Sequence, residues 1–407
     1  MVKKKLKPKG LIVSQYFYPE NFRINEIAKY LNNKNYKIDI LTGYPCYPNK
    51  KIYEKFYKNK KNFSKYYNCK IYRLPTISRG SGGAINLLLN YFSFLITGIM
   101  FSKKLLKKNN YDFIFTFGVT PLTVALVSNY ISKLKNAKSI LWLLDLWPQV
   151  INELKVSKIP FFFFLAKIIS KKVFTETDYI LVQSKSFKKE ISYYKTKNKI
   201  VYFPNWAEEF KKKKIAKTKE KKIFSIVFAG NIGEAQNFDK VLEAANILKN
   251  ENLRWIIVGS GRFLEKVKKY IFDNRINNFH IIGHKNKKNI WYYYNLADIL
   301  LLSLKGTKYI SKTIPGKLQT YLRTNKYIIG FSKGESAKLI MKSKAGSIIN
   351  PDRPDLLAKR IKYLLENKDI ILKRENSIDT KKYIQKLFNR KIILNFLDKK
   401  IIRTIIK

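Results

Sequence analysis

Short apolar runs alternate with segments of helical pattern along almost the whole chain, and this alternation limits the fold more than any other feature. In residues 226–250, for example, a short apolar run leads into a turn with two glycines, and apolar residues then recur at helical spacing. Strands that are each followed by a helix predict a parallel sheet with helices on both faces. We therefore expect an α/β protein of doubly wound parallel sheets.

A lysine-rich stretch divides this alternation into two halves. Residues 210–222 cannot bury an apolar face, which indicates a linker. A chain of 407 residues is long enough for two Rossmann-like domains, and the carboxyl ends of their strands would face a cleft that suits two substrates. The expected division is a first Rossmann-like domain over 1–203, a linker over 204–222, a second Rossmann-like domain over 223–385 and a basic helix over 386–407.

The composition limits partners and compartment. The net charge is +54, but lysine is spread over nearly every segment and no nucleic-acid-binding motif occurs, so nucleic acid is not an expected partner. The excess charge can still draw the protein to an anionic membrane surface. Two cysteines without a CxxC pair indicate neither a disulfide scaffold nor a zinc site, and the basic N-terminus lacks an apolar signal core. We expect a cytoplasmic protein.

Two apolar segments in the first half suggest contact with a membrane. Residues 85–101 carry no charge and are followed by lysines, and residues 159–174 repeat the pattern with aromatic residues. One face of the first segment is polar, since polar residues recur there at spacings of three and four: Asn86, Asn90, Ser93 and Thr97. A helix lying in the membrane interface and an ordinary core helix both fit, and a transmembrane span is less favoured.

Three turns in the second half predict a phosphate-binding site. Two of them are glycine turns, at 230–233 and 259–261, and the third opens a helix at 315–317. Glycine lets a ligand approach the backbone, and helix N-termini attract anions. The alternatives are plain βα connections and a lysine that merely lies on the surface. The candidate donor-binding residues are Gly230, Asn231, Gly233, Gly259, Gly261, His284, Pro315 and Lys317.

Other site types find little support in the sequence. The 259–261 turn lacks the third glycine of a dinucleotide-binding motif, since Leu264 stands there. There is neither an Asp-x-Asp pair nor a His/Cys cluster, so no metal and no cofactor is expected. Of the two histidines, His280 lies in an apolar strand and is expected to be structural, whereas His284 follows a strand end where a ligand could bind.

The first half offers a carboxylate at the end of a strand. Asp145 follows an apolar run and precedes Trp147, so it is the candidate catalytic residue, either holding a sugar hydroxyl or accepting a proton. The alternative is a cap for the helix that follows. The chain between the first strand and first helix supplies further acceptor-site candidates, although Asn21 could also cap that helix. The acceptor-binding candidates are Glu20, Asn21, Arg23 and Trp147.

Several of these segments resemble one family in combination. The stretches at 14–28, 41–48, 141–148, 228–237 and 311–322 are similar to glycosyltransferase family 4, also called group 1, in the branch that builds O-antigen, capsule and colanic acid and includes L-fucosamine transferases. The resemblance implies a GT-B fold and a retaining, metal-independent transfer from a UDP-sugar, of an N-acetylated amino or deoxy sugar. The acceptor would be a polyprenyl-diphosphate-linked sugar at the cytoplasmic face of the membrane. Residues 1–203 would then form the acceptor-binding domain, with membrane-facing helices, and residues 223–385 the nucleotide-sugar-binding domain.

The chain departs from the wider family at two charged positions. Relatives hold the diphosphate with Arg and Lys five residues apart, but here Asn231 and Gln236 occupy that spacing, so backbone N–H groups, Lys317 or another lysine must compensate the charge. Relatives also carry two glutamates with seven residues between them, where this chain has Lys312 and Thr320. The resemblance adds three residues to the donor-binding candidates: Gln236, Gln319 and Thr320.

Two other functions remain open at this point. A nucleotide-sugar epimerase shares the two-domain architecture and the diphosphate loops, but it needs acids and histidines in its cleft and gains nothing from apolar helices with a lysine fringe. A basic nucleic-acid-binding protein predicts steep salt dependence of binding, and it leaves the three turns unexplained.

Overall fold

A computed structural model describes residues 7–47, 50–80, 83–153, 160–194, 199–209, 223–376, 383 and 386–406. The chain forms two compact units. Unit 1 comprises Met1–Phe203 with Ile393–Lys407, and unit 2 comprises Pro204–Ile392. Most of the predicted linker, residues 210–222, lies outside the described residues.

Unit 1 contains a sheet of eight strands, among the residues described, in the order β3-β4-β2-β1-β5-β6-β7-β8. All neighbouring strands are parallel except β3 and β4, which form an antiparallel pair at one edge that the sequence pattern did not predict. The elements of this unit, in chain order, are β1 (Lys9–Ser14), α1 (Arg23–Asn33), β2 (Lys37–Gly43), α2 (Glu54–Lys58), β3 (Lys65–Tyr66), β4 (Cys69–Leu74), α3 (Ala84–Leu105), β5 (Phe113–Gly118), α4 (Thr123–Lys135), β6 (Lys138–Leu143), α5 (Pro160–Glu176), β7 (Tyr179–Val182), α6 (Lys185–Ser192) and β8 (Lys199–Tyr202).

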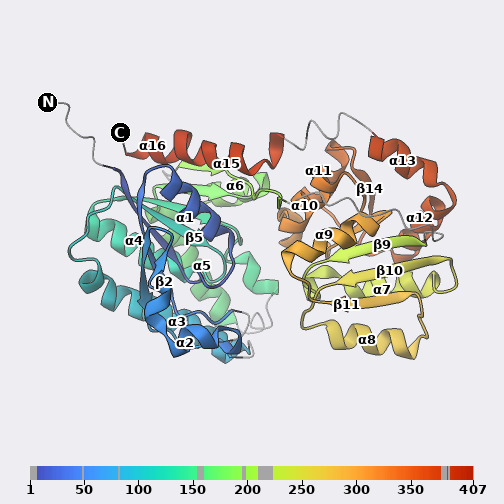
Figure 1. The fold of residues 1–407 in the computed structure, drawn as a ribbon, viewed down its shortest axis with the longest axis horizontal. Coiled ribbons are helices and arrows are strands. Elements are labelled where there is room, and N and C mark those ends of the chain that lie inside the picture. Colours follow the sequence, from blue (N-terminus) through green and yellow to red (C-terminus); the bar gives the residue numbers. More distant parts are fainter. Residues whose placement is uncertain are drawn as a thin grey trace. The chain divides into compact units, whose positions relative to one another are not determined.

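The C-terminal segment belongs to unit 1, where it packs beside α1 (Figure 1). This segment contains α15 (Arg390–Phe396) from Ile393 on, a π-helical stretch (Leu397–Ile402) and α16 (Arg403–Ile405). The hydroxyl of Tyr36 donates to the buried Asp398 carboxylate at 2.7 Å, and Arg403 pairs with the same carboxylate at 3.0 Å. Burial and the hydrogen bond to Asp398 raise the pKa of Tyr36 to about 12. The segment predicted as a separate basic helix is therefore held to unit 1 by a buried acid.

Unit 2 contains a fully parallel sheet, in the order β11-β10-β9-β12-β13-β14. One apolar core lies between the sheet and α7, α8 and α12, and a second lies between the sheet and α9, α10 and α11. The elements are β9 (Phe224–Ala229), α7 (Phe238–Ile247), β10 (Leu253–Val258), α8 (Leu264–Asp273), β11 (Phe279–Gly283), α9 (Lys287–Leu296), β12 (Ile299–Ser303), α10 (Gly316–Thr324), β13 (Tyr327–Phe331), α11 (Glu335–Lys342), β14 (Gly346–Ile349), α12 (Pro354–Glu366) and α13 (Lys368–Asn376).

These two sheets confirm the predicted α/β fold of doubly wound parallel sheets. The strands read as unbroken apolar runs because both faces of each sheet are covered, so their side chains are buried on either side. His280 is an exception to the expected core, since it is exposed on β11, the edge strand of unit 2.

Candidate active site

The glycine turns of unit 2 lie side by side at the carboxyl ends of their strands. The N–H of Gly230 donates to the Val258 carbonyl at 2.9 Å, and the N–H of Ile232 donates to the Ser260 carbonyl at 2.9 Å. A Cβ added to Gly259 would lie 1.8 Å from the Gly230 carbonyl oxygen, and Gly259 has a φ of +156°. Glycine is thus required at position 259 because the two turns touch each other there. The sequence analysis had explained the glycine by the approach of a ligand.

The residues that replace the family's Arg and Lys hold the first turn together. The side-chain Oε1 of Gln236 accepts the Gly233 N–H at 3.0 Å and the Asn231 Nδ2 at 3.3 Å. Gln236 therefore closes the loop through hydrogen bonds and brings no charge to it.

Lys317 brings an amine to the same place. It leaves the first turn of α10, and its Nζ is buried without a hydrogen-bond partner among the described residues, although part of the side chain reaches solvent. The Nζ lies 3.8 Å from the centroid of the Phe228 ring, and a Cβ on Gly230 would lie 2.9 Å from it. Burial lowers the pKa of the Lys317 amine to about 7.

A tyrosine that the sequence analysis missed holds α10 against β9. The hydroxyl of Tyr321 is buried, accepts the Ala229 N–H at 2.8 Å and donates to the Ala229 carbonyl at 3.4 Å. Burial raises the pKa of this hydroxyl well above its usual value, so it stays protonated. The tyrosine therefore sets the distance between the start of α10 and the turn after β9.

Two predicted donor-binding residues that follow Lys317 on α10, Gln319 and Thr320, are buried inside unit 2. Gln319 is buried, and its amide nitrogen donates to the carbonyls of Gly316 and Pro315 at 3.0 and 3.2 Å. Thr320 is also buried, donating to the Gly316 carbonyl and accepting the Glu208 N–H, each at 3.4 Å. Both side chains therefore make contacts that shape the start of this helix. His284, by contrast, is exposed after β11.

In unit 1, Asp145 lies half-buried just after β6. Its Oδ2 accepts the backbone N–H of Thr120 at 2.7 Å, and the Trp147 Nε1 donates to the Thr120 hydroxyl at 3.3 Å. The structure thus brings the two predicted residues together with a third, Thr120, which the sequence analysis did not single out. The three link the loops that follow β5 and β6.

Glu20 holds two loops of unit 1 together. Its buried carboxylate accepts the N–H groups of Cys46, Tyr47 and Phe17 at 2.9, 2.8 and 3.1 Å. Burial raises its pKa to about 7, although these hydrogen bonds and the charge of Arg73 act in the opposite direction. Glu20, which was predicted to bind the acceptor, therefore accepts hydrogen bonds from backbone N–H groups of its own unit.

Its two neighbours among the acceptor-binding candidates lie nearer the surface. Asn21 is exposed, and the alternative of a helix cap is wrong, because α1 begins after Phe22 without any side-chain cap. Arg23 pairs with Glu26 at 3.3 Å.

An aromatic surface at the carboxyl ends of β1 and β2 was missed by the sequence analysis. The ring of Tyr16 stacks on Phe22 at 5.3 Å between centroids, and Tyr47, which packs against both, is 42% exposed. The guanidinium of Arg79 lies 4.8 Å from the Tyr47 ring centroid and donates to the Tyr16 hydroxyl at 3.4 Å. Aromatic rings beside an arginine form a surface suited to a sugar and an anion, and the clustered aromatics around residues 16–22 and 44–47 were the available signal.

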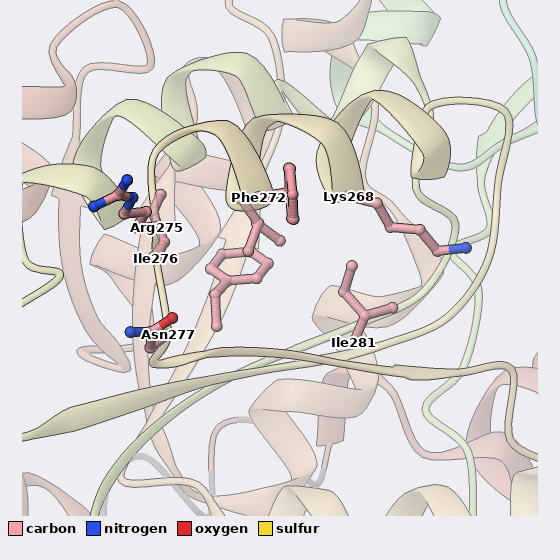
Figure 2. A pocket seen from close by; sticks show the side chains of 8 residues that line it. Lys268, Phe272, Arg275, Ile276, Asn277 and Ile281 are labelled. Atoms are coloured by element: carbon pink, nitrogen blue, oxygen red, sulfur yellow. The ribbon is translucent and has the colours of Figure 1, made fainter.

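One pocket of unit 2 lies apart from the glycine turns. A pocket of about 520 Å³ lies between α8 and β11. Figure 2 shows some of the side chains that line it, among them Lys268, Phe272, Arg275 and Asn277. Asn277 precedes β11, so the pocket lies near the amino end of that strand, away from the glycine turns.

In the described part of the chain, no group of three or more His, Cys, Asp or Glu residues could hold a metal. Independence from metal stays a prediction.

Comparisons of sequence connect the chain with known proteins. Residues 207–385 match the family described as "Glycosyl transferases group 1". WbjE of Pseudomonas aeruginosa, whose name assigns it glycosyl transfer, is 24% identical over 41% of this chain and 44% of its own length. WcaI of Escherichia coli K12, named for colanic acid biosynthesis, is 24% identical over 58% of this chain and 61% of its own length. Each alignment therefore spans less than two thirds of the relative.

Comparisons of structure extend over nearly the whole chain. Sucrose-phosphate synthase from Thermosynechococcus elongatus is similar with a TM-score of 0.75 at 12% identity, covering 98% of this chain and 99% of the other. HepE of Anabaena, solved in complex with UDP-glucose, is similar with a TM-score of 0.65 at 10% identity, covering 96% and 98%. Together with the two parallel sheets these likenesses establish the GT-B fold. Residues 207–385, nearly all of unit 2, thus carry the group 1 glycosyltransferase domain of family 4, and the whole chain has the GT-B fold.

Proposed function

We propose that this protein transfers a sugar from a UDP-sugar to a polyprenyl-diphosphate-linked acceptor, with retention of configuration and without a metal, in the synthesis of O-antigen, capsule or exopolysaccharide. It would act at the cytoplasmic face of the plasma membrane, and the sugar would be an N-acetylated amino or deoxy sugar. The names of WbjE and WcaI and the UDP-glucose bound to HepE support this class of reaction. The observation that carries it is the unpartnered buried amine of Lys317.

The amine of Lys317 is matched to a diphosphate. Burying an ammonium group without a partner costs free energy, and a bound phosphate oxygen would supply the missing acceptor. The N-terminus of α10 adds backbone N–H groups and a partial positive charge beside it. One lysine from α10 thus takes the place of the family's Arg and Lys, whose positions hold Asn231 and Gln236 in this chain.

The reaction then needs charge stabilisation and an oriented acceptor. The bond between the sugar C1 and the β-phosphate oxygen breaks while the acceptor oxygen bonds to C1 on the same face, and the leaving phosphate takes the acceptor proton. Lys317 stabilises the charge that develops on the departing UDP. Asp145 orients the acceptor hydroxyl, and its contact with Thr120 holds it at the end of β6.

The aromatic surface of unit 1 suits the acceptor. Tyr47 exposes ring area on which a sugar can stack, and the Arg79 guanidinium beside it can pair with a phosphate of a lipid diphosphate. This contact would add to those of the predicted acceptor-binding residues, of which Trp147 lies in the loop after β6.

Thermal unfolding with nucleotides tests the donor half of this proposal. We expect UDP and one UDP-sugar to raise the melting temperature in the presence of EDTA, because a ligand at a hundredfold its Kd adds about 2.7 kcal/mol of stability. Lys317→Met keeps an unbranched side chain, one atom shorter, and removes the amine, so the shift should disappear. The exposed Lys308 provides the matched control, and Lys308→Met should respond like the wild type. An undiminished shift in Lys317→Met would contradict the proposed site.

A further inference from the structure

Helix α3 of unit 1 turns its large apolar side chains outward. They recur at spacings of three and four, so they form one stripe along the helix, and three of them are exposed by 74% (Ile85), 53% (Ile96) and 65% (Met100). The other exposed members are Leu89, Phe92 and Ile99. Among the described residues, this helix alone is long and apolar enough to cross a membrane, and 22% of its most apolar window is buried.

Part of the polar stripe of α3 faces the protein, although Asn86 at its start is exposed. Asn90 is buried, its Oδ1 accepts Gln15 Nε2 at 2.7 Å, and its Nδ2 donates to the Ile77 carbonyl at 2.5 Å. The Ser93 hydroxyl accepts the Ile77 N–H at 3.0 Å, and Thr97 donates back to the Ser93 carbonyl at 2.6 Å. The polar face predicted from sequence is therefore confirmed only in part: Asn90 and Ser93 form hydrogen bonds with other parts of unit 1, whereas Thr97 bonds to the backbone of its own helix.

Close packing fixes α3 in this orientation. A Cβ on Gly98 would lie 2.8 Å from the methyl carbons of Val127, so the glycine lets α4 approach closely. Phe94 of α3 and Leu106, which follows it, are buried in the core that this helix shares with α4 and the sheet. The helix is thus attached lengthwise to a folded domain, a geometry that suits lying on a surface and not crossing a bilayer.

Charge at the end of the helix indicates what covers the apolar stripe. No acidic residue occurs between 84 and 105, and the helix ends in Lys103 and Lys104, which are exposed, as are Lys107 and Lys108 beyond it. Helix α5, which packs against α4 as α3 does, exposes Phe164 and Ile168 among the lysines 167, 171 and 172. Apolar side chains with a lysine fringe match the acyl chains and anionic headgroups of a membrane surface.

We propose that α3 is a membrane-docking helix, which inserts its apolar stripe into the interface of an anionic bilayer while Asn90 and Ser93 stay hydrogen-bonded inside unit 1. The proposal concerns a surface remote in sequence from the donor-binding residues, so it can stand or fall independently of the reaction. It defines the side of unit 1 that faces lipid.

Vesicle sedimentation with the full-length protein tests this surface. Wild-type protein should partition into vesicles of phosphatidylglycerol and phosphatidylethanolamine at least tenfold more strongly than the variant Leu89→Gln/Ile96→Gln/Ile99→Gln. A control replaces three apolar residues that are even more exposed on unit 2, and it should bind as the wild type does: Ile247→Gln/Phe272→Gln/Leu372→Gln. Both variants should keep the melting temperature and the shift with UDP, which separates loss of docking from loss of fold or of donor binding.

Site-specific labelling locates the contact. Both native cysteines are buried and free, so a cysteine placed at Ile96 can be labelled selectively with an environment-sensitive fluorophore. Its emission should shift to the blue with anionic vesicles, whereas a label at Phe272→Cys should not respond. Equal vesicle binding by the α3 variant and the wild type, or no response of the Ile96→Cys label, would overturn the proposal. It would also fail if the wild type were a dimer that the α3 variant dissociates and that does not bind vesicles, because the stripe would then join two copies of the chain.

Discussion

The ammonium nitrogen of Lys317 lies 3.8 Å from the centroid of the Phe228 ring, directly beside Gly230 and without a hydrogen-bond partner among the residues described. Phe228 belongs to β9 and Lys317 to α10, which are separated in the chain by three intervening strands. The contact thus places an amine that can take up a proton at the turn where the family resemblance implies Arg and Lys and this chain has neither. Several of the predictions below depend on it.

The buried amine should make both stability and donor affinity depend on pH. Its pKa is lowered to about 7, below the value of an exposed lysine, so between pH 7 and about 10 the unfolded chain binds more protons than the folded one. The contribution of Lys317 to the free energy of unfolding should therefore rise with pH in this window. Denaturant titrations should show a shallower rise in Lys317→Met, while Lys308→Met keeps the wild-type slope.

Donor binding should change with pH in the opposite direction. A phosphate stabilises the protonated amine, so UDP should bind with uptake of protons above pH 7, and its affinity should fall by up to about tenfold per pH unit. Calorimetry in buffers of different ionisation enthalpy measures this uptake directly. A proton uptake that is unchanged in Lys317→Met would exclude this lysine as its source.

Gly259→Ala should destabilise unit 2. The new Cβ would lie 1.8 Å from the Gly230 carbonyl oxygen at a φ of +156°, so the two turns must separate, at a cost of about 2–3 kcal/mol. Gly283→Ala is the control, because its φ is +75° but nothing lies within 4 Å of the new Cβ, and the cost should be about 1 kcal/mol. Equal losses in urea titrations would show that crowding between the turns is unimportant.

Tyr321→Phe should weaken the attachment of α10 to β9. Removing the hydroxyl leaves the Ala229 N–H buried without its acceptor, which should cost about 1–3 kcal/mol in the free energy of unfolding. Since Lys317 lies on the same helix, the affinity for UDP should fall as well. Tyr292→Phe, at a tyrosine that is half exposed, should change neither quantity measurably. Full UDP affinity in Tyr321→Phe would argue against a positioning role.

Glu20→Gln should flatten the dependence of stability on pH in the acid range. The pKa of Glu20 is raised to about 7, so between pH 4.5 and 7 the folded state binds more protons than the unfolded state, and stability should fall as pH rises. Unfolding of the wild type by urea at pH 5 and pH 7 measures this slope. The exposed Glu54 supplies the control, since Glu54→Gln should keep it.

Asp145→Asn should reduce turnover at least a hundredfold while the thermal shift with UDP persists. The carboxylate would orient the acceptor hydroxyl in unit 1, whereas the donor-binding candidates all belong to unit 2. Sugar transfer to a lipid-linked acceptor is the readout. Turnover at the wild-type rate would remove Asp145 from the catalytic residues.

The sequence by itself determined the α/β architecture and the strand ends at which the candidate residues cluster. The alternation of apolar runs with helical periodicity is a local property, and it predicted the parallel sheets of both units. The glycines at 230 and 259 were equally visible as turn residues. The reason why glycine is needed at position 259 was not visible. The residue lies against the Gly230 carbonyl, in a loop that a helix and a strand separate from it in the sequence.

Only the tertiary structure decided which way side chains point and what covers them. The spacing of Asn90, Ser93 and Thr97 predicted that they share a helix face, but spacing cannot tell whether that face meets water or Gln15 and Ile77 inside the protein. In the same way, Lys317 reads as any other lysine until α10 packs against β9 and buries its amine on Phe228. Periodicity shows which residues share a face of one helix or strand. The burial and the protonation state of a side chain depend on neighbours that the fold brings from elsewhere in the chain.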